Sequence, residues 1–288
     1  MEILFGMVLG FIWVNLGFNV MHDASHYALF LSPKFNNCAS KLWHSFGLWN
    51  HEIWFYHHVL SHHSHTNTDK DVDAHHLQPL LRKHKDQQQG WSPLFAYPLL
   101  TVVAPGFYFG QSLGYFVIPV LFGALLWTDV KIPRNNYSLF DILLMTVRIK
   151  LFYEMGIWSS LSHMVMNNLL YQANIIGDHD TFEVSVTNHY EGKDWLRLQV
   201  QNSGNFKTDS PIYTYVFGGI NHIEHHLFPN MCNCFYSQIS PTVQQFCKDN
   251  HIPYVVHKSL LEVFQEYYSL NSEIFQVQEK YRFLIYTI

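Results

Sequence analysis

The chain has 288 residues, of which 48% are hydrophobic, 17% aromatic and only 14% charged. Soluble domains average about 25% charged residues, so the composition favours a protein that places apolar surface in a membrane. A formal net charge of −5 without a basic patch or tail excludes a nucleic-acid partner. The four cysteines are too few and too irregularly spaced for a disulfide framework or a zinc site.

Three apolar stretches predict membrane helices, at residues 3–20, 107–127 and 151–170. No Lys or Arg precedes the first stretch, so a membrane helix explains it better than a secretory signal. The last span starts near 151 because charged side chains at 148, 150 and 154 are tolerated only where they reach the interface. A short turn at 128–137 joins the second and third spans.

The number of spans predicts which segments share a side of the membrane. If the first span crosses once and the other two form a hairpin, residues 22–90 and everything after about 171 lie on one side. Basic residues between 34 and 85 favour the cytosolic side. We therefore expect an all-α integral membrane protein, a helical bundle with a cytosolic cap rich in histidine.

The twenty histidines include three clusters, HDASH at 22–26, HVLSHH at 58–63 and HIEHH at 222–226. A spacing of three or four places rings on one helical face, whereas adjacent residues point about 100° apart. Eight rings are too many for one ion with four to six ligands but suit two ions. Imidazole binds Fe, Zn, Cu and Ni, so ligand type leaves the metal open. The eight candidates are His22, His26, His58, His62, His63, His222, His225 and His226.

The order of these clusters, with apolar helices between the second and third, resembles the integral-membrane fatty acid desaturase family. HHSHTN at 62–67 with its trailing acidic residues, GDHDTFE at 177–183 and QNSGNF at 201–206 are similar to segments of that family. GGINHIEHHLFPNM at 218–231 is most similar to the front-end and sphingolipid-type branch. The resemblance extends over about residues 10–255.

The resemblance implies a membrane desaturase domain at 1–255, followed by a C-terminal tail at 256–288. It implies two iron ions that use O₂ to introduce a cis double bond into a long acyl chain of an acyl lipid or acyl-CoA. The eight cluster histidines would be the iron ligands, with His163 in SSLSHMVMNN as a ninth. The family usually has two membrane helices before the first cluster, so we expect the first helix to be missing here.

The resemblance also implies partners and a location. No HPGG haem motif occurs in the chain, so a separate cytochrome b5-type donor with its reductase is expected. The expected location is the endoplasmic reticulum membrane, with the histidines facing the cytosol. The third cluster begins with His222 where that branch usually has Gln, so the position of the double bond is not transferred.

Other residues near the clusters have two readings. A carboxylate or a further histidine can accept a hydrogen bond from the second ring N–H of a ligand histidine. For the acidic residues, a solvated position without this role is an equal alternative. The candidates for this supporting role are Asp23, His65, Asp69, Asp71, Asp73, His179 and Glu224. His44, His51 and His257 are expected at the surface or in loops. Trp13, Trp49 and Trp54 are expected in an interfacial belt or core rather than in a substrate wall.

Competing functions remain open at this point. A sphingolipid desaturase or a lipid hydroxylase would use the same centre. A metal-binding membrane transporter would need ionisable residues inside its spans, whereas these histidines lie outside them. A zinc hydrolase needs one ion and three ligands, which eight histidines exceed.

Overall fold

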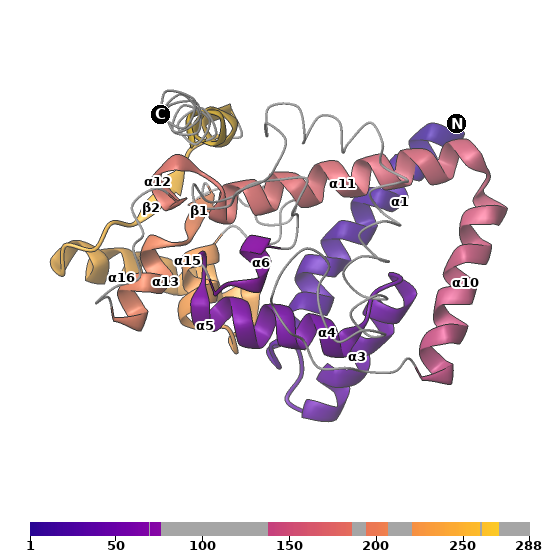
Figure 1. Ribbon diagram of the computed structural model, residues 1–288, viewed down its shortest axis with the longest axis horizontal. Coiled ribbons are helices and arrows are strands. Elements are labelled where there is room, and N and C mark those ends of the chain that lie inside the picture. Colours follow the sequence, from indigo (N-terminus) through magenta and orange to yellow (C-terminus); the bar gives the residue numbers. More distant parts are fainter. Residues whose placement is uncertain (69, 76–137, 186–193, 207–220, 260, 271–288) are drawn as a thin grey trace, which may run out of the picture.

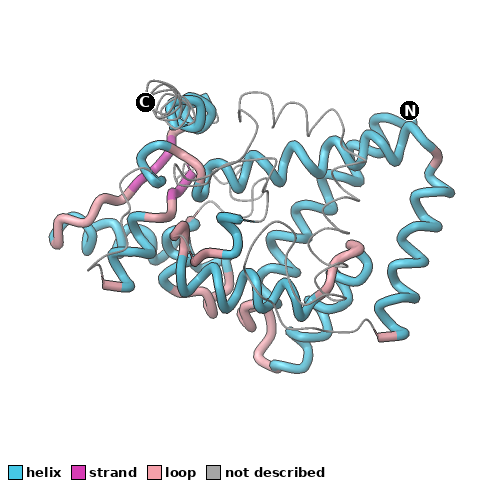
Figure 2. Tube along the Cα trace, viewed as in Figure 1, coloured by secondary structure: helices cyan, strands magenta, loops and turns pink. Residues whose placement is uncertain are grey.

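The computed structural model describes residues 1–68, 70–75, 138–185, 194–206, 221–259 and 261–270. The described part is mostly helical (Figure 2). The N-terminal half contains α1 (Glu2–Leu16), the π-helix η1 (Gly17–His22), α2 (Asp23–Ser25), α3 (Pro33–Phe46), α4 (His51–Trp54), the π-helix η2 (Phe55–His62), α5 (His63–His65) and α6 (Val72–His75). The C-terminal half contains α10 (Leu139–Met155), α11 (Ile157–His179), α12 (Phe182–Ser185), α13 (Trp195–Gln201), β1 (Gly204–Phe206), α15 (His222–Leu227), the 3₁₀ helix η4 (Asn233–Phe235), α16 (Tyr236–Asp249) and β2 (Val255–His257).

Helix α1 packs against α11 through two glycines one helical turn apart (Figure 1). A Cβ atom at Gly10 would lie 2.5 Å from the backbone oxygen of His163, and one at Gly6 would overlap Ser159 and Ser162. Small residues at this spacing let helix backbones approach closely. The other side of α1 exposes apolar side chains such as Phe5 and Ile12. The contact therefore fixes the position of α1 relative to α11.

The continuous helical segment Glu2–Ser25 is long and apolar enough to cross a membrane by length and composition. It contains the stretch predicted as the first span. The predicted span at 107–127 and the predicted turn at 128–137 both lie outside the described residues.

The span predicted at 151–170 is wrong as a single helix. Gly156 adopts φ +78°, and its N–H donates to the Tyr153 oxygen at 3.3 Å, which ends α10. Helix α11 then starts at Ile157 and runs in another direction (Figure 1). Apolar composition continues through the corner, so hydropathy merged two helices, whereas only glycine adopts this backbone conformation readily.

One short pair of β-strands corrects the expected all-α class. The same pair corrects the expected start of the C-terminal tail. β1 and β2 form a parallel pair in which Gly204 aligns with Val255 and Phe206 with His257. The expected domain boundary after residue 255 therefore falls inside β2. Val263 in the helical residues 261–270 is fully buried, so this part of the predicted tail belongs to the core.

A small apolar core supports α15 from behind. The buried side chains of Val200 on α13, Ile223 on α15, and Val243 and Cys247 on α16 pack together with Ile252. Ile223 lies between His222 and His225 on the same short helix. Packing of Ile223 in the core therefore fixes the orientation of α15 and of its histidines.

Candidate metal centre

Four segments that are distant in the sequence bring nine histidines together. They are the junction of η1 and α2, the junction of η2 and α5, the C-terminal end of α11, and α15. Two of the segments are π-helical, a rare form with i→i+5 hydrogen bonds that is common at functional sites. All of these rings except His22 are buried. The nine are His22, His26, His58, His62, His63, His179, His222, His225 and His226.

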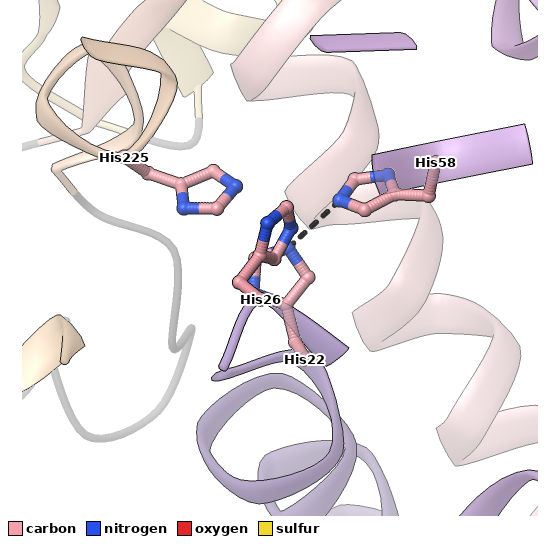
Figure 3. A group of neighbouring side chains, drawn as sticks. All are labelled: His22, His26, His58 and His225. Carbon is pink, nitrogen blue, oxygen red and sulfur yellow. Dashed lines mark hydrogen bonds between the residues drawn. The ribbon is translucent and has the colours of Figure 1, made fainter. Parts of the chain in front are cut away.

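The first group consists of His22, His26, His58 and His225, whose ligand atoms lie within 4.8 Å of one another. Figure 3 shows these four rings facing a common centre. The Nε2 atoms of His22 and His58 are 2.9 Å apart. His63 adjoins the group, with its Nε2 3.1 Å from Nε2 of His225. The group can therefore offer four or five nitrogen ligands to one ion.

The second group consists of His62, His179, His222 and His226, again within 4.8 Å. The Nε2 atom of His179 lies 3.1 Å from that of His62, 2.7 Å from that of His222 and 3.3 Å from that of His226. Four ring nitrogens thus converge on one point. The two groups are adjacent, since the rings of His58 and His62 stack with centroids 5.2 Å apart.

The hydrogen bonds on the far side of the rings decide which nitrogens carry hydrogen in the second group. Nδ1 of His179 lies 2.8 Å from the Asn202 backbone oxygen, which can only accept, so Nδ1 is the donor. Nδ1 of His226 lies 2.9 Å from Oε1 of Gln199, whose amide nitrogen donates to the His63 oxygen. In both neutral rings Nε2 therefore carries no hydrogen and presents a lone pair.

The same reasoning extends to His62 and to the first group. Nδ1 of His62 donates to the Asp71 carboxylate at 2.9 Å. Tyr236 donates its hydroxyl hydrogen to the Phe228 oxygen, so the hydroxyl oxygen accepts from Nδ1 of His225 at 3.2 Å. Lone pairs that converge without hydrogen between them repel each other and require a cation. The donor set of both groups therefore fits metal ions held by imidazole nitrogen.

Burial keeps six of the nine rings neutral, which is the form that binds metal. Burial lowers the pKa of His58 to about 3, although Asp73 opposes the shift. Burial, followed by the charges of neighbouring histidines, holds the pKa of His26, His63, His222, His225 and His226 well below the ordinary value. Burial alone would raise the pKa of Asp71, but His62 and the Asn67 N–H lower it overall.

These shifts predict how the metal-free protein responds to acid. Histidines of the unfolded chain take up protons near pH 6.5, whereas the buried rings do not, so the unfolded state binds more protons below that pH. Stability should therefore be highest above about pH 6.5 and fall as pH decreases, by about 1.4 kcal/mol per pH unit for each such ring. Thermal unfolding of chelator-treated protein in detergent between pH 8 and 5 measures this. An unfolding temperature that stays constant over that range would contradict it.

The structure brings together all eight histidines that the sequence predicted, but it divides the clusters differently. The four-residue pair His58 and His62 was expected to share one ion. The two rings fall in different four-histidine groups, although they also form a third candidate site together with Asp73. HIEHH is also divided, with His225 in the first group and His222 and His226 in the second. In η2 the π-helical form changes which residues share a face. In α15, an ordinary α-helix, the adjacent residues His225 and His226 point about 100° apart.

The ninth candidate, His163, does not reach either group. Its Nε2 lies 2.7 Å from a guanidinium nitrogen of Arg148, where α11 packs against α10 and α1. His179, predicted as a supporting residue, instead lies among the rings of the second group, at the end of the same helix. The correction has a simple cause, because the helix runs past His163 for several turns before it reaches the other histidines.

The supporting residues had mixed outcomes. Asp73 lies 2.6 Å from Nε2 of His57 and 3.6 Å from Nδ1 of His58, so it supports the second cluster. Asp23 has one carboxylate oxygen 4.0 Å from Nδ1 of His22, while its other oxygen accepts from the Asn233 N–H at 2.9 Å and holds the loop after α15. His65 belongs to neither group, and Asp69 lies outside the described residues.

Glu224 turns away from the rings, which corrects its predicted role. It is fully buried and accepts from Asn205 at 2.8 Å and from the Tyr254 hydroxyl at 2.6 Å. It therefore anchors α15 to β1 and to the segment before β2, and it does not contact a ligand ring.

Sequence reasoning missed three residues that fix ring orientation: Gln199, Asn202 and Tyr236. A signal existed for Asn202, because it belongs to the QNSGNF segment that resembles a family motif. Nothing in the sequence linked Gln199 or Tyr236 to a histidine, because both contacts depend on how α13 and α16 pack against α15.

A pocket with about 820 Å³ of empty space adjoins both groups. Its walls include the ring side chains of His22, His58, His62, His179 and His222. Apolar walls come from Phe18, Trp54, Tyr171 and Ile175. A ligand in this pocket can therefore contact apolar side chains and ions held by the rings at the same time.

Comparisons with known proteins find relatives that are named as desaturases. The chain is 23% identical to an acyl-lipid (8-3)-desaturase of Mortierella alpina, over 92% of this chain and 63% of the relative. It is 25% identical to an sn-1 linoleoyl-lipid 6-desaturase of Synechocystis, over 87% of this chain and 74% of the relative. It is 28% identical to an acyl-lipid (7-3)-desaturase of Rebecca salina, over 86% of this chain and 58% of the relative.

The chain thus spans between 58% and 74% of the lengths of these relatives. The sequence model for fatty acid desaturase matches residues 2–258, from the first residue of α1 to the end of the strand pair. This range contains the eight histidines of the two groups and the adjoining His63. On this match, the chain belongs to the fatty acid desaturase family.

Proposed function

We propose that this protein is a membrane-bound desaturase that introduces a cis double bond into a long acyl chain. The observation that supports it most is the pair of adjacent histidine groups whose lone pairs converge beside an apolar pocket. Two iron ions at these groups would supply the oxygen-dependent removal of hydrogen from an unactivated methylene. The family and its named relatives favour iron over the other metals that imidazole binds.

The residues of the chain contribute binding, orientation and exclusion of water. Asp71, Gln199, Asn202 and Tyr236 hold ligand rings in the tautomer that presents Nε2 to the ion. The aromatic walls of Phe18, Trp54 and Tyr171 would place an alkyl chain beside the rings, as proximity of a methylene to the oxidant requires.

The substrate, partners and location are part of the same proposal. The named relatives act on acyl lipids, so an acyl lipid is the first substrate to test and an acyl-CoA the second. A separate cytochrome b5-type protein and its reductase would deliver the electrons. The endoplasmic reticulum membrane is the proposed location, with the apolar stretch at 3–20 of the segment Glu2–Ser25 in the bilayer and the histidines on the cytosolic side.

A metal transporter is less well supported. Transport through a membrane requires ionisable residues along the spans. Within α1 the only residue with a charged side chain is Glu2, at the first position. The histidines lie in one buried chamber, which suits retention of an ion rather than its passage.

Expression in a yeast that supplies cytochrome b5 tests the function, with candidate acyl chains fed in parallel. We expect a new unsaturated methyl ester by gas chromatography and mass spectrometry, whose fragmentation also locates the double bond. The His226→Ala variant, which lacks a ring of the second group, should accumulate in membranes without the product. Product formation by that variant would contradict the assignment of the centre.

A further inference from the structure

A second pocket adjoins the metal pocket and is lined mainly by aromatic side chains. It has about 680 Å³ of empty space. Four residues line both pockets: Phe18, His22, Trp54 and Tyr171. Further walls come from Trp13, Trp43 and Trp49. Trp54 and Trp49 also belong to an apolar core cluster, as the sequence led us to expect. The two pockets are therefore neighbours that meet at the four shared side chains.

One wall residue of the second pocket, His44 on α3, is polar and only 1% exposed. This corrects its expected surface position. Nδ1 of His44 lies 2.8 Å from the backbone oxygen of Ser40. A carbonyl oxygen can only accept a hydrogen bond, so Nδ1 carries the hydrogen. In the neutral ring Nε2 is then a lone-pair acceptor.

The Nε2 atom of His44 is buried and has no hydrogen-bond partner among the described residues. The ring lies among pocket walls, with its centroid 5.5 Å from that of Trp54 and 6.2 Å from that of Trp49. Burial, followed by the charge of His51, holds the pKa of His44 well below the ordinary value, so the ring stays neutral. Native proteins rarely leave a buried acceptor unpaired, so a donor on a bound water or a ligand is expected to pair with it.

We propose that the second pocket binds a long-chain lipid with a hydroxyl group, and that this hydroxyl donates a hydrogen bond to Nε2 of His44. The aromatic walls would bury the alkyl chain, while the hydroxyl supplies the donor that a plain methylene chain or an ester lacks. His44 is then a specificity-determining residue that separates hydroxylated from plain chains, since a buried polar group rejects a ligand that leaves it unpaired. The inference deepens the proposed function. It rests on that function only where it identifies the hydroxylated lipid as the substrate.

Fluorescence quenching tests the proposal without turnover, because Trp13, Trp43, Trp49 and Trp54 all line the second pocket. The probes are two brominated C18 chains that are identical except for one hydroxyl group, titrated into the purified full chain in detergent. We expect the hydroxylated probe to bind about fivefold tighter, the factor that one ordinary hydrogen bond provides. His44→Leu should remove this preference.

His51→Leu is the matched control. His51 also contacts Ser40, with its Nδ1 3.0 Å from the Ser40 hydroxyl oxygen, yet it lines neither pocket. This variant should keep the preference. His44→Gln retains an acceptor and should recover part of the preference, which separates a lost hydrogen bond from a damaged fold.

Equal binding of the two probes to the unmodified protein would overturn the proposal, as would a preference that survives in His44→Leu. A second pair of probes, a 2-hydroxyacyl chain and a long-chain base of equal length, identifies the source of the hydroxyl. A preference that persists in His226→Ala, which lacks turnover, supports the inference independently of the proposed function. An unmodified protein that forms unsaturated product but shows no preference overturns the inference alone.

Discussion

His179→Ala should lose the metal ion of the second group and lower desaturation by at least about 100-fold. The ring places its Nε2 within 3.3 Å of the Nε2 atoms of His62, His222 and His226, at the centre of the group. Loss of a residue that only orients a ligand already costs about 10-fold to 100-fold, so loss of a ligand should cost more. Iron per protein by elemental mass spectrometry, together with methyl-ester analysis, measures both effects.

His163→Ala is the control for this prediction, because it removes a buried histidine from the same helix. His163 contacts Arg148 rather than the metal groups, so this variant should keep its full iron content. Its stability should fall by about 1–3 kcal/mol, since a buried guanidinium nitrogen loses its partner. Iron loss in His163→Ala with full iron in His179→Ala would restore the ligand set that the family resemblance implied.

Gly10→Ala should destabilise the protein by about 1–3 kcal/mol and reduce its iron content. The added Cβ would lie 2.5 Å from the His163 oxygen and 3.0 Å from Cβ of Met166, so α1 must move away from α11. That movement displaces His22 and His26, which follow on the same continuous helical segment. Thermal unfolding in detergent and elemental analysis of iron test the result.

Gly17→Ala is the matched control, because it adds the same methyl group farther along the same segment. Its Cβ would meet Nε1 of Trp43 at 3.5 Å, an ordinary contact distance. Unfolding temperature and iron content should stay close to those of the unmodified protein. If both variants lose stability equally, close packing of α1 on α11 is not the cause.

Local chemistry explains what could be predicted from the sequence. The eight histidines and the apolar segment at 3–20 are recognisable because spacing and hydropathy are properties of neighbouring residues. Prediction from neighbouring residues failed where the local backbone conformation interrupts the sequence pattern. Gly156 divides an apolar stretch into two helices, and the π-helical turns of η2 divide His58 from His62.

The sequence by itself determined that eight imidazoles would be available for two ions next to apolar helices. The tertiary structure decided which rings form a group, because each group combines residues from segments more than a hundred positions apart. It also decided the tautomers, since Gln199 and Asn202 reach His226 and His179 only after α13 packs on α15 and α11. Long-range packing creates these contacts, and no local spacing encodes them. The unpaired nitrogen of His44 in an aromatic pocket has the same origin.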